Sequence, residues 1–151
     1  MNWTIEVICL PVTDVDRAKE FYGERLGFGV DFDTDQGGTR VVQVTPPGSG
    51  CSIAFGVGLV DENSAVLRAT GGPPMRPGSA QGLQLVVGDL PAAHAELTGR
   101  GVAVSPIQVF GRDGELHPYR EGEELDNVGF FFFSDPDGNG WAVQQISSRL
   151  A

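Results

Sequence analysis

The chain has 151 residues, of which 40% are hydrophobic, so it can form one domain with a sizeable core or two small fused modules. Its formal net charge is -10, which argues against nucleic acids and anionic membranes as partners, because phosphate groups are bound by basic surfaces. No run is long enough to span a membrane, and the apolar start lacks the basic residues of a signal peptide. Cys9 and Cys51 fall in predicted strands and fit buried free thiols in a reducing compartment, so we expect a cytoplasmic protein.

The first part of the chain, over about residues 4–56, predicts a strand, a helix and three further strands. Thr13 or Asp14 is placed to cap the helix and Gly27 to end it, because apolar residues recur at helical spacing between them. β-branched and aromatic runs separated by turn residues predict strands over residues 5–12 and 28–32, a turn over 33–38, and a hairpin over 40–55.

A linker is expected over residues 57–81. Its Gly- and Pro-rich run at 71–78 is incompatible with regular structure, although residues 63–70 could hold a short turn or helix.

The pattern then restarts. Asp89 is placed to cap a second helix, on whose outer face we expect His94 to be exposed, and residues 111–127 form an insertion without a counterpart in the first half. Pro46 of the first hairpin aligns with Pro136 of the last one, which indicates an internal repeat. Strands are expected over residues 83–87, 102–110 and 141–146, and over the four phenylalanines at 130–133, which read as a strand buried on both faces.

Three passages carry a family resemblance: residues 12–28, residues 83–90 and Asp135-Pro136-Asp137-Gly138-Asn139. They are similar to the vicinal oxygen chelate superfamily, which includes glyoxalase I, bleomycin-resistance proteins, fosfomycin-resistance enzymes and extradiol dioxygenases. The resemblance implies an α+β fold of two βαβββ modules, residues 1–56 and 82–151, whose curved mixed sheets surround a central cavity with the helices outside. It also implies a homodimer, and the linker would let the modules pair within one chain or across a swapped dimer.

The positions of the family's metal ligands are the informative part of the resemblance. In metal-using members, a His or Glu stands seven residues before the Asp that caps each helix, and another stands four residues after each turn glycine. In this chain those positions hold Val7, Gly82, Ser52 and Ala142. Zinc, iron and manganese prefer imidazole, thiolate or carboxylate ligands, so we expect no metal and no other cofactor at these positions.

Strand alternation predicts which residues face the cavity. Cys9, Gln84 and Gln144 share parity with the vacated metal positions, and the resemblance adds Phe130 and Phe132. In the corresponding strand of the first module it adds Arg40 and Val42. These seven residues form the predicted ligand-binding set. The structural alternative is that the glutamines hydrogen-bond the backbone and the phenylalanines are ordinary core.

Three functions are compatible with these residues. We favour a metal-free protein that binds a small organic molecule, cationic or aromatic, because the metal positions are vacated and the chain is acidic. The alternative is a metal-independent lyase or isomerase in which His117 and Tyr119 of the insertion supply acid and base. The least favoured is a metalloenzyme with an unorthodox ligand set around His117. The insertion itself could be a lid or a solvated acidic loop.

Overall fold

The computed structural model describes residues 1–149, which form two compact units. Unit 1 comprises Met1–Ala80 together with Asp135–Asn139, and unit 2 comprises Gln81–Ser134 and the chain from Gly140 onward. Each unit has its own mixed sheet, of four strands in unit 1 and five in unit 2, which confirms the expected α+β class. None of the helices in residues 1–149 combines the length and the hydrophobicity needed to cross a membrane.

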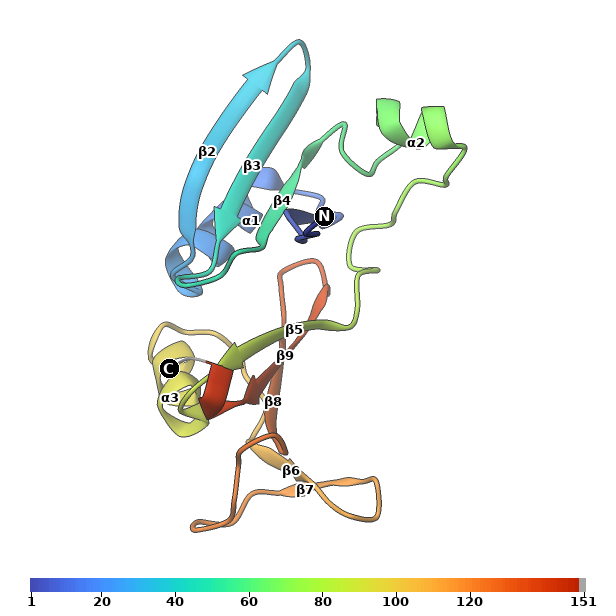
Figure 1. The fold of residues 1–151 in the computed structure, drawn as a ribbon. Helices are drawn as coiled ribbons and strands as arrows, with labels where there is room; N and C mark the ends of the chain where they lie inside the picture. Colours follow the sequence, from blue (N-terminus) through green and yellow to red (C-terminus); the bar gives the residue numbers. More distant parts are fainter. Residues whose placement is uncertain (150–151) are drawn as a thin grey trace. The chain divides into compact units, whose positions relative to one another are not determined.

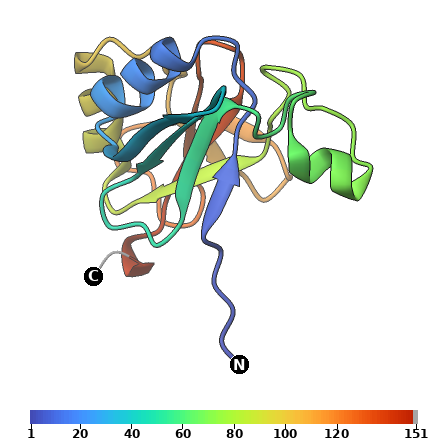
Figure 2. The same cartoon turned by 90° about the horizontal axis from the view of Figure 1, so that it is seen from above.

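The sheet of unit 1 has the strand order β1-β4-β3-β2 (Figure 1). Only β1 and β4 are parallel, and the other neighbours are antiparallel. Helix α2 stands off this sheet in both views (Figures 1 and 2). The strands are β1 (Val7–Cys9), β2 (Gly29–Gln36), β3 (Thr39–Thr45) and β4 (Ser52–Val57), and the helical segments are α1 (Val15–Glu20), its π-helical continuation η1 (Phe21–Arg25) and α2 (Ala65–Thr70).

The helix start in unit 1 follows the sequence prediction, whereas two strand boundaries do not. Asp14 caps α1 by accepting a 3.0 Å hydrogen bond from the Arg17 N–H. Strand β1 is shorter than residues 5–12, because regular pairing to β4 is confined to three residues. Strand β2 is longer than expected, since Gly37 and Gly38 both take positive φ and make a tight two-residue turn.

The core of unit 1 lies between α1–η1 and one face of the sheet. Tyr22 is fully buried, and its ring centroid lies 5.5 Å from that of Phe55 on β4 and 6.2 Å from that of Phe28. Val42 and Val44 of β3 are fully buried on the same face as Phe55. This face is called the α1-proximal face below.

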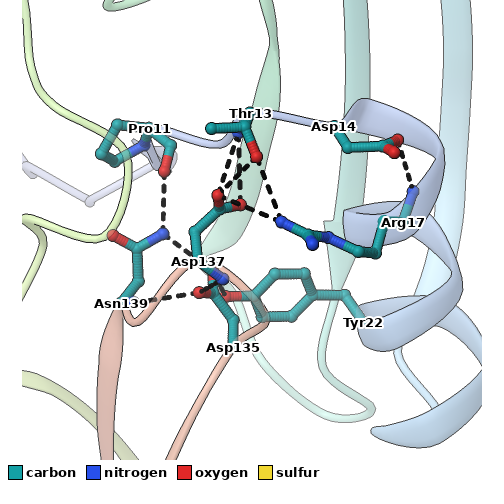
Figure 3. Close-up of polar contacts among 8 residues, drawn as sticks. All are labelled: Pro11, Thr13, Asp14, Arg17, Tyr22, Asp135, Asp137 and Asn139. Atoms are coloured by element: carbon teal, nitrogen blue, oxygen red, sulfur yellow. Dashed lines mark hydrogen bonds and ion pairs between the residues drawn. The ribbon is translucent and has the colours of Figure 1, made fainter.

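Residues 135–139, the predicted tight turn, are built into unit 1 (Figure 3). Asp135 Oδ1 accepts from the backbone N–H groups of Asp137 and Asn139, both at 2.9 Å. The Asn139 side-chain amide donates to Pro11 O at 2.9 Å, and the Asp137 carboxylate accepts from Thr13 Oγ1 at 2.7 Å. The turn is therefore joined by hydrogen bonds to the segment that leads into α1.

The sheet of unit 2 has the strand order β5-β9-β8-β6-β7, and β5 is parallel to β9. Its strands are β5 (Leu83–Val87), β6 (Gln108–Phe110), β7 (Leu116–Pro118), β8 (Gly129–Ser134) and β9 (Gly140–Gln145), and its helical segments are α3 (Leu90–Gly99) and η2 (Ser147–Arg149). Asp89 caps α3 as predicted, accepting from the Ala92 N–H at 3.0 Å. Strand β7 lies within the insertion and pairs with β6.

The strand predicted over residues 102–110 is reduced to β6. Pro106 has no N–H to donate, which interrupts regular pairing. Ser105 replaces part of the ladder, because its N–H donates to Phe132 O at 2.8 Å and its hydroxyl accepts from the Phe132 N–H at 2.9 Å.

The core of unit 2 lies between α3 and one face of its sheet. Phe131 and Phe133 are 0% and 5% exposed, whereas Phe130 and Phe132 are only partly buried, so β8 is not buried equally on both faces. The expectation that His94 is exposed is also wrong. Its ring stands edge-on to Phe131 at 5.2 Å, and its Nε2 lies 2.9 Å from Ser105 O, because this side of α3 packs on the sheet.

Candidate functional site

Each sheet has a face that points away from its helix, and strand register identifies its residues. The α1-distal face in unit 1 carries Val7, Cys9, Gln43, Thr45, Ser52 and Ala54. The α3-distal face in unit 2 carries Gln84, Phe130, Phe132, Ser134, Ala142 and Gln144. Four of the seven predicted ligand-binding residues, Gln84, Phe130, Phe132 and Gln144, are thus brought together in unit 2.

The vacated metal positions lie at these faces. Val7 and Ser52 are register partners on the α1-distal face, and Ala142 stands opposite Gln84 on the α3-distal face. Gly82 directly precedes β5. Over residues 1–149 there is no group of three or more His, Cys, Asp or Glu side chains placed to hold a metal ion. Val, Gly and Ala have no side-chain atom that can bind a metal and Ser is a poor ligand, so the residues at the family's positions do not fit a metal.

The α3-distal face combines flat aromatic surface with amide groups. The rings of Phe130 and Phe132 are parallel within 4°, with centroids 6.3 Å apart. Beside them, the Gln84 amide donates to Gln144 Oε1, and Gln144 Nε2 donates to Asn127 O at 2.8 Å. Gln144 thus hydrogen-bonds the backbone, as the structural alternative expected, whereas Gln84 hydrogen-bonds a side chain. Gln84 Oε1 nevertheless accepts no hydrogen bond from the described residues and is available to a donor.

A cavity of about 340 Å³ opens at one end of this face. Its walls include Phe132, Gln84 and two of the vacated metal positions, Gly82 and Ala142. Gly82 and Ala142 have little or no side chain, which leaves this end of the face open. Apolar walls with a few polar groups are typical of small-molecule sites.

Cys9 lies on the α1-distal face, opposite Ala54 of β4. Its side chain is half-buried, and this burial raises the pKa of the thiol. A raised pKa favours the neutral thiol, which is a weaker nucleophile than the thiolate.

Arg40 and Val42 lie on the opposite face from the one expected. Val42 is fully buried on the α1-proximal face, and Arg40 pairs with Asp16 of α1 at 2.8 Å and with Asp33 at 2.9 Å. The reason is the length of the turns. Residues 46–51 separate β3 from β4, whereas residues 135–139 separate β8 from β9. One extra residue reverses which side chains of β3 point to each face, so Gln43 and Thr45 occupy the α1-distal face instead.

Two further residues of the α1-distal face, Asp31 and Phe32, were missed by sequence reasoning. Val30 pairs with Val44 and Phe32 with Gln43, so Asp31 is the extra residue of a β-bulge. Its carboxylate accepts from Gln43 Nε2 at 3.1 Å and Thr45 Oγ1 at 2.5 Å. The hydrogen bonds from Thr45 and then from Gln43 lower the pKa of Asp31. No local sequence pattern predicts a β-bulge at this position of β2.

In the insertion, His117 pairs with Asp113, with 3.0 Å between His117 Nε2 and Asp113 Oδ2. The backbone N–H of Glu115 and the His117 side chain lower the pKa of Asp113. His117 also lines a cavity of about 530 Å³ together with Arg120 and Glu123. Tyr119 is half-buried and is not among the lining residues, so the structure does not bring the two predicted catalytic residues into one cavity.

Comparisons with known proteins identify the family and the fold of the chain. Residues 4–143 match the family model described as Glyoxalase/Bleomycin resistance protein/Dioxygenase superfamily. An antibiotic binding protein from Streptomyces sp. CB03234 is 29% identical with a TM-score of 0.67, and the match covers 97% of this chain and 98% of that one. A glyoxalase/bleomycin resistance protein from the same organism is 30% identical with a TM-score of 0.64, and the match covers 94% and 100% of the two chains. A superfamily member from Sphaerobacter thermophilus DSM 20745 is 27% identical with a TM-score of 0.67, over 95% and 98%. No curated protein matches the chain.

Proposed function

Because the chain belongs to the glyoxalase/bleomycin resistance protein/dioxygenase superfamily, we propose that it binds a small organic molecule at the α3-distal face without a metal ion. One observation carries the proposal. The parallel rings of Phe130 and Phe132 share a face with Gln84, and a cavity lined by Phe132, Gln84 and the vacated positions Gly82 and Ala142 opens at one end of that face. The antibiotic binding relative supports a small-molecule ligand.

The chemistry of this face favours a flat aromatic ligand with a hydrogen-bond donor. The two parallel rings offer an apolar surface against which another ring can stack. Gln84 Oε1, which accepts no hydrogen bond within residues 1–149, would accept from a hydroxyl or amine group on the ligand. Neither interaction requires a metal ion.

The proposal is tested by titrating naphthylmethanol into the protein in the presence of EDTA and measuring heat or thermal stabilisation. We expect saturable binding with one site per chain, weakened about tenfold in Phe132→Ala because a stacking surface is lost. Phe110→Ala is the matched control, since Phe110 is exposed at the end of β6 and, although register puts it on the same face, it does not line the cavity. Absence of saturable binding, or an equal loss of affinity in both variants, would contradict the proposal.

We also propose a cytoplasmic homodimer. The two free cysteines fit a reducing compartment. Trp3 and Ile5 are 89% and 68% exposed in the segment that leads into the edge strand β1, and such apolar side chains are covered in an assembly. Sedimentation at micromolar concentration should give twice the 16.0 kDa mass of one chain, and a monomer would refute the dimer.

A second candidate function is a metal-independent lyase or isomerase, favoured by the His117–Asp113 pair at the cavity in the insertion. A carboxylate that orients an imidazole is a common arrangement for a general base. If His117 removes a proton from carbon, a bound ligand in D2O should exchange that proton, and His117→Ala should abolish exchange without weakening binding. Unchanged exchange in the variant would eliminate this site.

A further inference from the structure

We infer that the α1-distal face recognises a protonated amine, with the Asp31 carboxylate as its ionic partner and the Phe32 ring as its apolar wall. The inference goes beyond the proposed function, since it adds a second binding site, in unit 1, for a ligand of a stated chemical class. It is carried by residues of unit 1 alone.

The β-bulge creates this pair. In a regular strand, successive side chains alternate between faces, so Asp31 and Phe32 would point in opposite directions. Because Asp31 is the extra residue, it contacts Gln43 and Thr45, while Phe32 stands in register with Gln43 on the same face. Phe32 is 40% exposed. A carboxylate and a partly exposed ring thus lie next to each other, and bulges often re-aim side chains at functional sites.

The Asp31 carboxylate is oriented on one side and open on the other. Its Oδ2 accepts from both Gln43 and Thr45, and Thr45 Oγ1 lies 2.7 Å from the Ser52 hydroxyl, which is itself buried. Its Oδ1 accepts no hydrogen bond from the described residues. The carboxylate is therefore held in one orientation with a free acceptor, and a cation bound there would not have to order it first.

No cation of residues 1–149 neutralises this charge. Asp33, two positions along β2, shows the contrast, because it is paired with both Lys19 and Arg40. Asp31 forms no such ion pair. A protonated amine would supply the missing positive charge and hydrogen-bond donor, since its N–H groups can donate to Asp31 Oδ1 while its carbon atoms contact the Phe32 ring.

The test compares naphthylmethylamine, which is protonated at pH 7, with the neutral naphthylmethanol in titration calorimetry. Wild type should bind the amine about tenfold more tightly than the alcohol, and Asp31→Asn should abolish this difference. Raising the salt concentration from about 0.05 M to about 0.5 M should also reduce the difference in affinity between the amine and the alcohol. Asp35→Asn is the matched control, because Asp35 lies on the other face of β2, opposite Arg40, and its loss changes the net charge equally.

The outcomes separate this inference from the proposed function. Equal affinity for amine and alcohol in wild type would overturn the inference and leave the aromatic site intact. Equal losses in Asp31→Asn and Asp35→Asn would also overturn it, because the preference would then come from net charge. Amine binding that depends on Asp31, with no binding of the alcohol, would support the inference and contradict the aromatic site in unit 2.

Discussion

Tyr22 donates a 2.8 Å hydrogen bond from its hydroxyl to Asp135 Oδ2, and both side chains are buried (Figure 3). The same oxygen accepts from the Asn139 amide at 2.8 Å. The two residues are 113 positions apart in the chain. This bond therefore closes unit 1 across two distant segments, the helical segment after α1 and the turn between β8 and β9.

Replacing Tyr22 with Phe should lower the stability of unit 1 by about 1 to 2 kcal/mol, because a buried carboxylate loses one of its donors. For a protein of this size the melting temperature should fall by roughly 4 °C. Tyr119→Phe makes the same chemical change at a half-buried residue whose hydroxyl has no hydrogen bond to the described residues, so its melting temperature should stay near that of wild type. Equal effects of the two variants in thermal unfolding would contradict the role assigned to Tyr22.

Val42→Ala tests the observed register of β3. Val42 is fully buried beside Phe55, so the variant should lose about 2 kcal/mol of unfolding free energy through two lost methyl groups and the cavity they leave. Val57→Ala, at a 38% exposed position of β4, should cost less than about 0.5 kcal/mol. Urea denaturation of both variants gives the comparison. A negligible cost for Val42→Ala would mean that Val42 lines an open face after all.

Asp33→Asn should alter how stability depends on pH. Hydrogen bonds from Arg40 and then Lys19 lower the pKa of Asp33 in the folded state. A carboxyl whose folded pKa lies below its unfolded value of about 3.9 stabilises the fold above that pH, and the contribution disappears as the pH falls toward the folded pKa. The variant should therefore be less stable than wild type near neutral pH, and the difference should narrow below about pH 4.

Urea midpoints measured from about pH 6 to about pH 2.5 test this prediction. Arg40→Gln removes the main cause of the lowered pKa and should show the same narrowing relative to wild type. A difference that stays constant over the whole range would mean that the ion pair does not affect the titration of Asp33.

Features that depend on local chemistry were predicted from the sequence. The caps at Asp14 and Asp89 and the turn at residues 135–139 were predictable because these side chains accept hydrogen bonds from backbone N–H groups only a few residues away. The family was likewise recognised from residues 12–28, 83–90 and 135–139, and the match over residues 4–143 confirms it.

The candidate site was predicted only in part, because face assignment depends on non-local register. Gln84, Phe130, Phe132 and Gln144 were placed correctly on one face, since β8 and β9 follow strict alternation. The prediction put Arg40 and Val42 on the wrong face of the sheet, because the turn after β3 is one residue longer than the turn after β8. The β-bulge at Asp31 was not predicted. One inserted residue moves every later side chain of a strand to the opposite face of the sheet. The contacts that stabilise such an insertion come from residues far away in the sequence, so local sequence does not predict it.

Gly78→Ala tests whether the Gly- and Pro-rich segment over residues 71–78 is tied to the rest of unit 1. Gly78 has a φ of +81°, and a Cβ there would lie 2.1 Å from Asp137 O in the turn. Gly114 has nearly the same φ, +82°, but open space around it. Both variants incur backbone strain of about 1 kcal/mol, whereas only Gly78→Ala also forces the turn to move, for a total of about 3 kcal/mol. The free energies of unfolding of the two variants, measured in urea, should therefore differ by about 2 kcal/mol. Equal losses would show that the segment over residues 71–78 can move away from the turn without cost and contributes nothing to the stability of unit 1.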